Sequence, residues 1–102
     1  MTTQACFDEV IHPSTRLSIV ALLASTDWAE FSFLRDRLAL SDSALSKQLA
    51  TLQDVGYVTI ERPVSNHRRR VRVALTEPGH RAFDGHVAAL QAVIASAERP
   101  TS

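Results

Sequence analysis

SDSALSKQLATLQDVGY, residues 41–57, carries the start and stop signals of one short helix. Ser41, Asp42 and Ser43 have side-chain oxygens that can cap the free N–H groups at a helix start. Apolar residues then recur at helical spacing, at Leu45, Leu49 and Leu52. Gly56 ends the pattern, because glycine reaches left-handed dihedrals at little cost. The stretch therefore predicts an amphipathic helix over about residues 41–55 that packs its leucines on a core.

The face of this helix opposite the leucines is polar. It carries Ser43, Lys47, Ala50 and Asp54, with Ser46 and Gln48 on its flanks. Small polar side chains and one lysine in the N-terminal half suit insertion into a DNA major groove, where large apolar or acidic groups would clash. From this stretch alone, an ordinary amphipathic surface helix is the alternative.

A second short helix is expected just before, over residues 31–38. Phe31, Leu34 and Leu38 form its apolar side, and the charges at residues 35–37 are expected to face solvent. So few residues separate the two helices that they predict a helix-turn-helix. Further upstream, a broad apolar pattern predicts a helix over residues 14–25, and residues 7–11 favour a short helical turn.

After Gly56 the apolar spacing changes from helical to alternating. Residues 57–62 and 71–75 each place apolar side chains on one face, and a turn-rich segment, residues 63–67, separates them. The pattern predicts a β-hairpin. Thr76 can cap a last helix to about Ala97, whose apolar residues follow a four-three rhythm that suits packing against the body or a partner helix.

The positive charges are gathered in one place. Formal net charge is zero, so the whole-chain balance does not indicate a nucleic acid partner. Five of the eleven Lys and Arg residues nevertheless fall between Arg62 and Arg72, and residues 63–76 contain no acid. This density predicts a phosphate-binding patch on the hairpin, with a solvated arginine cluster as the alternative.

Composition limits compartment and chemistry. The only cysteine is Cys6, so no internal disulfide can form and a reducing compartment is expected. No signal-like segment or membrane-length apolar run occurs, so we expect a cytoplasmic protein without a membrane partner. No phosphate loop or nucleophile elbow is found, so neither an enzyme nor a cofactor is expected.

The four histidines have no recognised metal-ligand spacing, and no metal site is predicted at His12, His67, His80 or His86. A ligand- or pH-responsive switch near His12 and His86 is a hypothesis. A redox role for Cys6 is another.

These elements together predict a mainly α fold of about five helices with a small two-stranded wing. In this order, the sequence resembles the compact bacterial and archaeal winged helix-turn-helix transcriptional regulators of the MarR and ArsR type. The resemblance covers roughly Phe7 to Ile94. It rests on His12-Pro13, Arg16-Leu17, Ile19, Phe31, Leu34, residues 40–46, Leu49, Leu52, Gly56-Tyr57-Val58, Leu75-Thr76, Gly79 and Ala82.

The resemblance implies one winged-helix domain over residues 5–97 that binds double-stranded DNA as a homodimer and regulates transcription, most simply as a repressor. By position, the DNA-binding residues would be Ser43, Ser46, Lys47, Gln48, Arg68, Arg69, Arg70 and Arg72. The dimer contacts would be Phe7, Val10, Ile11, Phe83, Val87, Leu90 and Ile94, the last four on a helix over about residues 77–97. Residues 1–4 and 98–102 are expected to be flexible.

The chain also departs from the pattern of these families. Many ArsR-type proteins sense metals through a cysteine pair near the helix-turn-helix, and no cysteine follows Cys6. The chain is shorter than typical MarR proteins, so an unknown small-molecule effector is left open. A winged helix used only for protein–protein contact is the alternative function.

Overall fold

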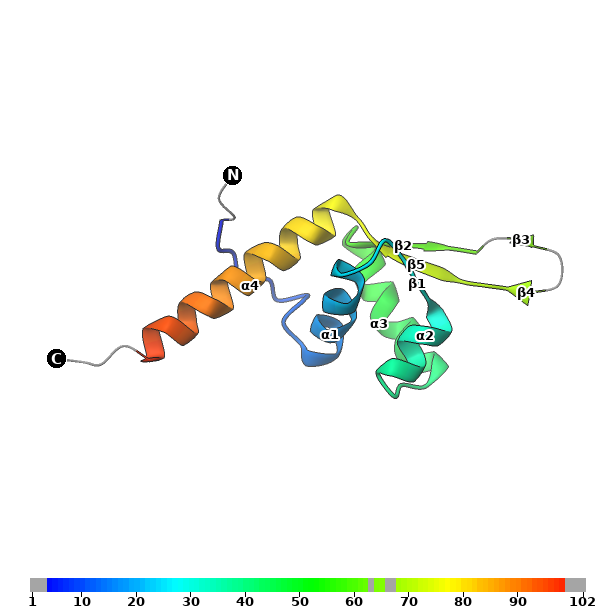
Figure 1. The fold of residues 1–102 in the computed structure, drawn as a ribbon, viewed down its shortest axis with the longest axis horizontal. Helices are drawn as coiled ribbons and strands as arrows, with labels where there is room; N and C mark the ends of the chain where they lie inside the picture. Colours follow the sequence, from blue (N-terminus) through cyan, green and yellow to red (C-terminus); the bar gives the residue numbers. More distant parts are fainter. Residues whose placement is uncertain (1–3, 63, 66–67, 99–102) are drawn as a thin grey trace.

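The computed structural model describes residues 4–62, 64–65 and 68–98 (Figure 1). In chain order it forms α1 (Ser14–Ala24), β1 (Ala29–Glu30), α2 (Phe31–Arg37), α3 (Asp42–Asp54), β2 (Val58–Glu61), β3 (Val64–Ser65), β4 (Arg68–Arg69), β5 (Arg72–Leu75) and α4 (Glu77–Glu98). The predicted mainly helical winged-helix architecture is confirmed. The described residues form four helices instead of about five, because residues 9–11 make one turn, closed by the His12 N–H bond to the Asp8 carbonyl at 2.9 Å.

A small antiparallel sheet forms the base of the wing. Its strand order is β1-β5-β2, with Val58 opposite Leu75 and Ala29 opposite Val73. Strands β3 and β4 pair further out and extend the hairpin (Figure 1). Strand β1 was not predicted, because two residues are too few to show alternation.

The core lies between α1, α3 and the sheet. Its buried apolar side chains are Ile11, Ile19, Val20, Leu23, Ala29, Leu34, Leu45, Leu49, Leu52, Val58, Val73 and Leu75. The predicted leucine stripe of α3 is thus confirmed as core. Burial of each Ile, Leu or Val side chain among them contributes roughly 1.5–3 kcal/mol.

Local signals fix the ends of the helices. The Ser41 hydroxyl accepts from the Ala44 N–H at 3.1 Å and caps α3, which ends before Gly56 at φ 80°. The Thr76 hydroxyl accepts from the Gly79 N–H at 3.0 Å and caps α4. These caps confirm the boundaries predicted for both helices to within about two residues.

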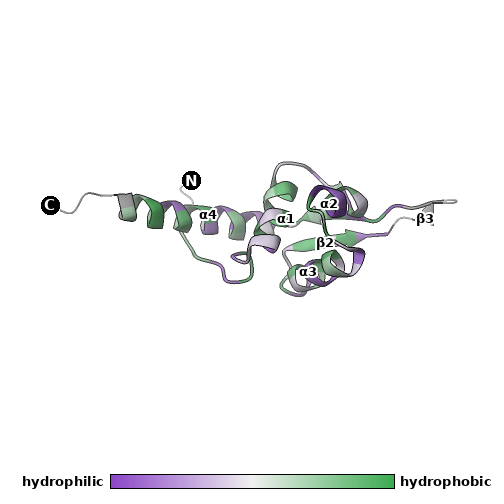
Figure 2. Ribbon diagram, turned by 90° about the horizontal axis from the view of Figure 1, so that it is seen from below, coloured by the Kyte–Doolittle hydropathy of each residue, from purple (hydrophilic) through white to green (hydrophobic). Residues whose placement is uncertain are grey.

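Helix α4 runs from the wing base across the body, and its last turns project beyond it (Figure 1). Colouring by hydropathy shows apolar residues along these projecting turns (Figure 2). Val93 and Ile94 there are 64% and 55% exposed. No helix in the described part of the chain is both long enough and apolar enough to span a bilayer.

Gly79 in the first turn of α4 generates a stability prediction. A Cβ at this position would overlap the Tyr57 carbonyl oxygen and the Leu75 side chain. Glycine to alanine in a helix normally stabilises, but here the backbone of the neighbouring segment would have to move. We expect Gly79→Ala to lower the free energy of unfolding by about 1–3 kcal/mol in denaturant titrations. Asp84→Ala, exposed on the same helix, should change it by no more than about 0.5 kcal/mol; a stabilised Gly79→Ala variant would contradict the close approach.

Candidate nucleic-acid interface

Helices α2 and α3 are joined by a turn of four residues, 38–41. The Leu40 N–H donates to the Arg35 carbonyl at 3.0 Å, and Ala39 adopts φ 55° in the left-handed region. A residue with a Cβ is strained there by roughly 1–2 kcal/mol. The tight turn confirms the predicted helix-turn-helix.

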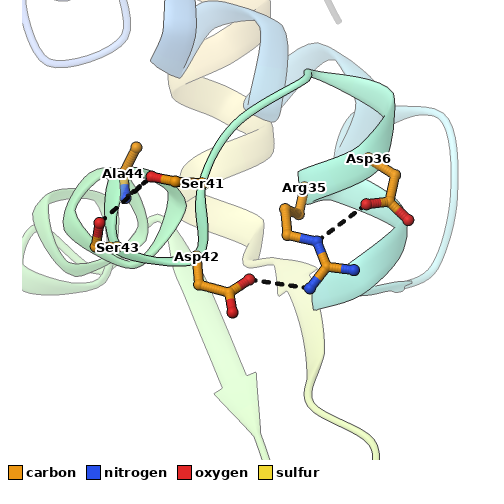
Figure 3. Close-up of polar contacts among 6 residues, drawn as sticks. All are labelled: Arg35, Asp36, Ser41, Asp42, Ser43 and Ala44. Carbon is orange, nitrogen blue, oxygen red and sulfur yellow. Dashed lines mark hydrogen bonds and ion pairs between the residues drawn. The ribbon is translucent and has the colours of Figure 1, made fainter.

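An ion-pair cluster ties α2 to the start of α3 (Figure 3). The Arg35 guanidinium contacts Asp36 Oδ1 at 3.0 Å and Asp42 Oδ1 at 2.9 Å. Hydrogen bonds to Asp36 and then Asp42 raise the pKa of Arg35 above its usual range. Arg35 was expected to face solvent, but it is half-buried because it bridges the two helices. Both carboxylates are exposed, so the bridge orients α2 and α3 more than it stabilises them.

The outer face of α3 presents most of the predicted DNA-reading residues. Ser43, Ser46 and Lys47 are exposed. Gln48 is half-buried instead, and its Oε1 accepts from Arg16 Nη1 at 2.9 Å. The first three side chains are therefore accessible to a ligand, although the Ser43 hydroxyl also lies 3.3 Å from the Ser41 hydroxyl (Figure 3). Gln48 is held at the edge of this face by a residue of α1.

The wing arginines differ from one another. Arg70 is exposed, and its Nη1 lies 3.4 Å from Oε1 of Glu30 on β1. Arg72 is half-buried, with its guanidinium carbon 4.2 Å from the centroid of the Trp28 ring, a cation–π contact. Its Nε is buried without a hydrogen-bond partner among the described residues. The predicted arginines Arg68 and Arg69 form β4, but their side chains lie outside the described part of the structure.

The acid-free run in the sequence is not acid-free in space. Arg72 stands opposite Glu30 on β1 and opposite Glu61 on β2. Glu30 was not predicted at the wing, because it lies 40 residues from Arg70 in the chain and comes close to it only through the unpredicted β1 pairing. The base of the wing is therefore a mixed-charge surface.

A groove of about 370 Å³ connects α3 with the wing base. Its lining includes Ser46 from α3, Ile60 from β2 and Arg62 just beyond β2. The polar face of α3 and the start of the wing thus border one shared groove, whose lining also includes the apolar residues Phe31, Leu49 and Val71.

The residues predicted for dimer contacts are placed unequally. Ile11 is fully buried in the core of its own chain, so its side chain offers no surface to a partner. Val10 and Phe83 are half-buried against that core. Phe7 and Ile94 are exposed, and Val87 and Leu90 are half-buried along α4.

Histidines from opposite ends of the chain come together. His12 Nδ1 lies 3.4 Å from His86 Nε2, and the Phe7 ring packs on both imidazoles. Among the residues that the structure describes, no three His, Cys, Asp or Glu side chains are grouped to hold a metal ion. The histidine contact is therefore a two-residue polar cluster in the described chain.

Comparisons with known proteins agree with this geometry. A family model described as "Winged helix DNA-binding domain" matches residues 15–94. An uncharacterized protein of Methanocaldococcus jannaschii is 28% identical over 79 residues, which cover 78% of this chain and 86% of that protein.

Solved structures are similar as well. A transcriptional regulator homologue from Pyrococcus horikoshii has a TM-score of 0.85 at 24% identity, covering 90% of this chain and 91% of that one. A zinc-responsive MarR family member from Lactococcus lactis has a TM-score of 0.66 at 22% identity, covering 96% of this chain and 67% of that one. At these identities the likeness is one of fold.

The left-handed residue in the helix-turn-helix generates a second stability prediction. Ala39→Gly should remove the Cβ strain at φ 55° and raise the free energy of unfolding by about 0.5–1 kcal/mol, net of the greater freedom of glycine in the unfolded chain. Ala50→Gly, exposed in the middle of α3, should lower it by about 1 kcal/mol. Thermal and denaturant unfolding of both variants measure the difference, and equal losses would refute the strain.

Proposed function

The chain belongs to the winged helix DNA-binding domain family, and from this premise we propose that it is a dimeric regulator of transcription that binds double-stranded DNA. The proposal places α3 in the major groove and the wing on the flanking backbone or minor groove. Repression is the simplest outcome, because a bound dimer blocks access to the DNA that it covers.

One observation carries the proposal. The outer face of α3 exposes Ser43, Ser46 and Lys47 and no large apolar side chain, while its leucines are wholly buried. A surface of small hydrogen-bonding groups and one cation matches base edges and phosphates. The adjoining groove and wing extend that surface.

We assign different roles to its members. Ser43 and Ser46 are suited to base edges or sugar, and Lys47 to a phosphate. Arg68, Arg69 and Arg70 would meet the backbone from the wing. Arg72 is held against Trp28, so we assign it to support of the wing more than to direct contact. Gln48 would act from the rim, in the position that Arg16 gives it.

The dimer is proposed from α4. Residues 87–97 contain no charged side chain, and the projecting turns expose Val93 and Ile94. A second copy of α4 would cover this apolar surface and place two α3 helices on one side of a duplex. Phe7 and Leu90 border the same stretch of α4 and would join the contact.

Protein–protein contact is the second candidate function, and a separate patch favours it. Trp28 and Phe33 are 43% and 54% exposed beside a hollow of about 480 Å³ whose lining also includes Leu22 and Glu30. Aromatic side chains of this kind are enriched in protein interfaces.

Removing positive charge from the proposed interface should weaken DNA binding. We expect Lys47→Ala, and Arg68→Ala with Arg70→Ala, to lower affinity for every duplex sequence and to reduce the slope of log affinity against log salt by about one for each lost phosphate contact. Fluorescence anisotropy with labelled duplexes over a range of salt concentrations measures both quantities.

Arg81→Ala is the matched control, because Arg81 is exposed on α4 and paired with Glu77. It removes the same charge from a residue outside α3 and the hairpin and should leave the salt slope unchanged. Equal slopes for all variants would reject the interface. Absence of salt-sensitive binding, with a partner protein captured in its place, would favour the second candidate.

A charge placed in the apolar face of α4 should dissociate the dimer. Ile94→Glu would bury a carboxylate between the two helices, whereas Ala92→Glu adds the same charge on the opposite face of α4. Sedimentation velocity should show monomers for Ile94→Glu and dimers for Ala92→Glu, with unchanged circular dichroism. A monomeric wild type would contradict the dimer directly.

A further inference from the structure

The first described residues cross α4 at Gly85 and His86. We call residues 4–12 the N-terminal strap (Figure 1). The Cys6 N–H donates to the Gly85 carbonyl at 2.9 Å, and a Cβ at Gly85 would come within 3.1 Å of the Gln4 carbonyl oxygen. The strap therefore approaches the backbone of α4 closely, at a position where the helix has no side chain.

His86 is the polar anchor of the strap. Its side chain is fully buried, and its Nδ1 accepts from the Asp8 N–H at 2.9 Å. An imidazole nitrogen that accepts a hydrogen bond carries no proton, so His86 is neutral with its proton on Nε2. His86 Nε2 lies 3.4 Å from His12 Nδ1, and the Phe7 ring packs against both imidazoles.

The charged groups around His86 do not offset the positive charge that a second proton would place on its ring. Burial, and then the charge of His12, lower the pKa of His86, with an opposing contribution from Asp8. The Asp8 carboxylate is already engaged, since Oδ1 accepts from the Val10 and Ile11 N–H groups and Oδ2 from the Tyr57 hydroxyl at 2.6 Å. The hydrogen bond to Asp8 raises the pKa of Tyr57 to about 12, so that hydroxyl keeps its proton throughout the neutral range.

The remaining titratable groups near the strap include Glu9 and Cys6, which are exposed, and Arg16 from α1. Arg16 connects the strap to the helix-turn-helix. Its Nε donates to the Val10 carbonyl at 2.6 Å, and its Nη1 donates to Gln48 Oε1 on α3 at 2.9 Å. One guanidinium thus joins the strap, α1 and the rim of the proposed DNA-reading face.

We propose that the N-terminal strap is a proton-released clamp, in which protonation of His86 detaches the strap from α4 and, through Val10 and Arg16, frees the side chain of Gln48. A proton on Nδ1 removes the acceptor of the Asp8 N–H and sets a positive charge against His12. Release of the strap stands on the described contacts alone. Only the effect of Gln48 on DNA rests on the proposed function.

The sign of the pH dependence follows from linkage. Because the pKa of His86 is lowered in the folded state, the unfolded chain binds more protons, and stability rises with pH. The contribution of neutral His86 is complete above the unfolded histidine value of about 6.5. This contribution to stability is lost as the pH falls from the unfolded pKa through the pKa of His86 in the folded chain.

The first experiment needs no DNA. NMR of the full chain between about pH 7.5 and about pH 5 follows the His86 ring protons and the exchange protection of the Cys6 and Asp8 amides. We expect His86 to titrate below its ordinary value and the two amides to lose protection in the same transition. Protection that persists after His86 has taken up its proton, or a titration at or above the ordinary histidine value, would overturn the clamp.

Three variants sharpen this test. His86→Gln can still accept from the Asp8 N–H but cannot be protonated, so it should keep the strap attached over the whole range. His80→Gln makes the same change on α4 away from the strap and should behave as wild type. His12→Gln removes a charge that disfavours protonation of His86. In this variant the strap should therefore be released at a higher pH than in the wild type. If His86→Gln does not fold, the wild-type titration alone decides.

The second experiment measures coupling to α3 with a fluorescein-labelled random-sequence duplex. Below the transition, wild type should bind about fivefold or more weakly than His86→Gln, and above it equally well. When both proteins also carry Gln48→Ala, the ratio of their affinities should return to one. A ratio of one in the wild-type background, or one that persists without Gln48, overturns the link through Arg16. No duplex binding at either pH overturns the proposed function, while the amide measurement still decides the clamp.

Discussion

Burial of Leu45, Leu49 and Leu52 fixes the rotation of α3 about its axis, and the rest of the structure depends on that constraint. With these three side chains in the core, Ser43 and Lys47 have no direction left but outward. The Ser41 cap and Gly56 then set where the helix begins and ends. The same short sequence thus determines both the core packing and the surface chemistry of α3. Because the apolar face is fixed in the core, the polar face has a fixed orientation as well.

Features written in local sequence could be predicted. The helix caps, the leucine stripe, the change to alternation after Gly56 and the winged-helix architecture all follow from residues within a few positions of one another. Strand β1, the Arg70 contact with Glu30 and the seat of Arg72 on Trp28 could not, because each joins segments some forty residues apart. Gly79 is one of the residues that carry the resemblance, and the fold gives it a reason: no side chain fits beside the Tyr57 carbonyl.

The candidate site shows the same division. Exposure of Ser43, Ser46 and Lys47 followed from helical periodicity, whereas the bond from Arg16 to Gln48 depends on how α1 crosses α3. Ile11 was expected at a dimer contact, yet it completes the core of its own chain because the turn at residues 8–12 folds it inward. The histidine pair brings together residues 74 positions apart, and only the path of the strap across α4 makes them neighbours.

Trp28 has one more consequence. It is the chain's single tryptophan, and it stacks against Arg72 at the foot of the hairpin while part of its ring meets solvent. Indole emission responds to nearby charge and to hydration, so this residue is a built-in optical reporter for the hairpin. Any ligand that moves Arg72 away from Trp28 or shields the ring from water would change the wavelength and intensity of the tryptophan fluorescence, without an added dye.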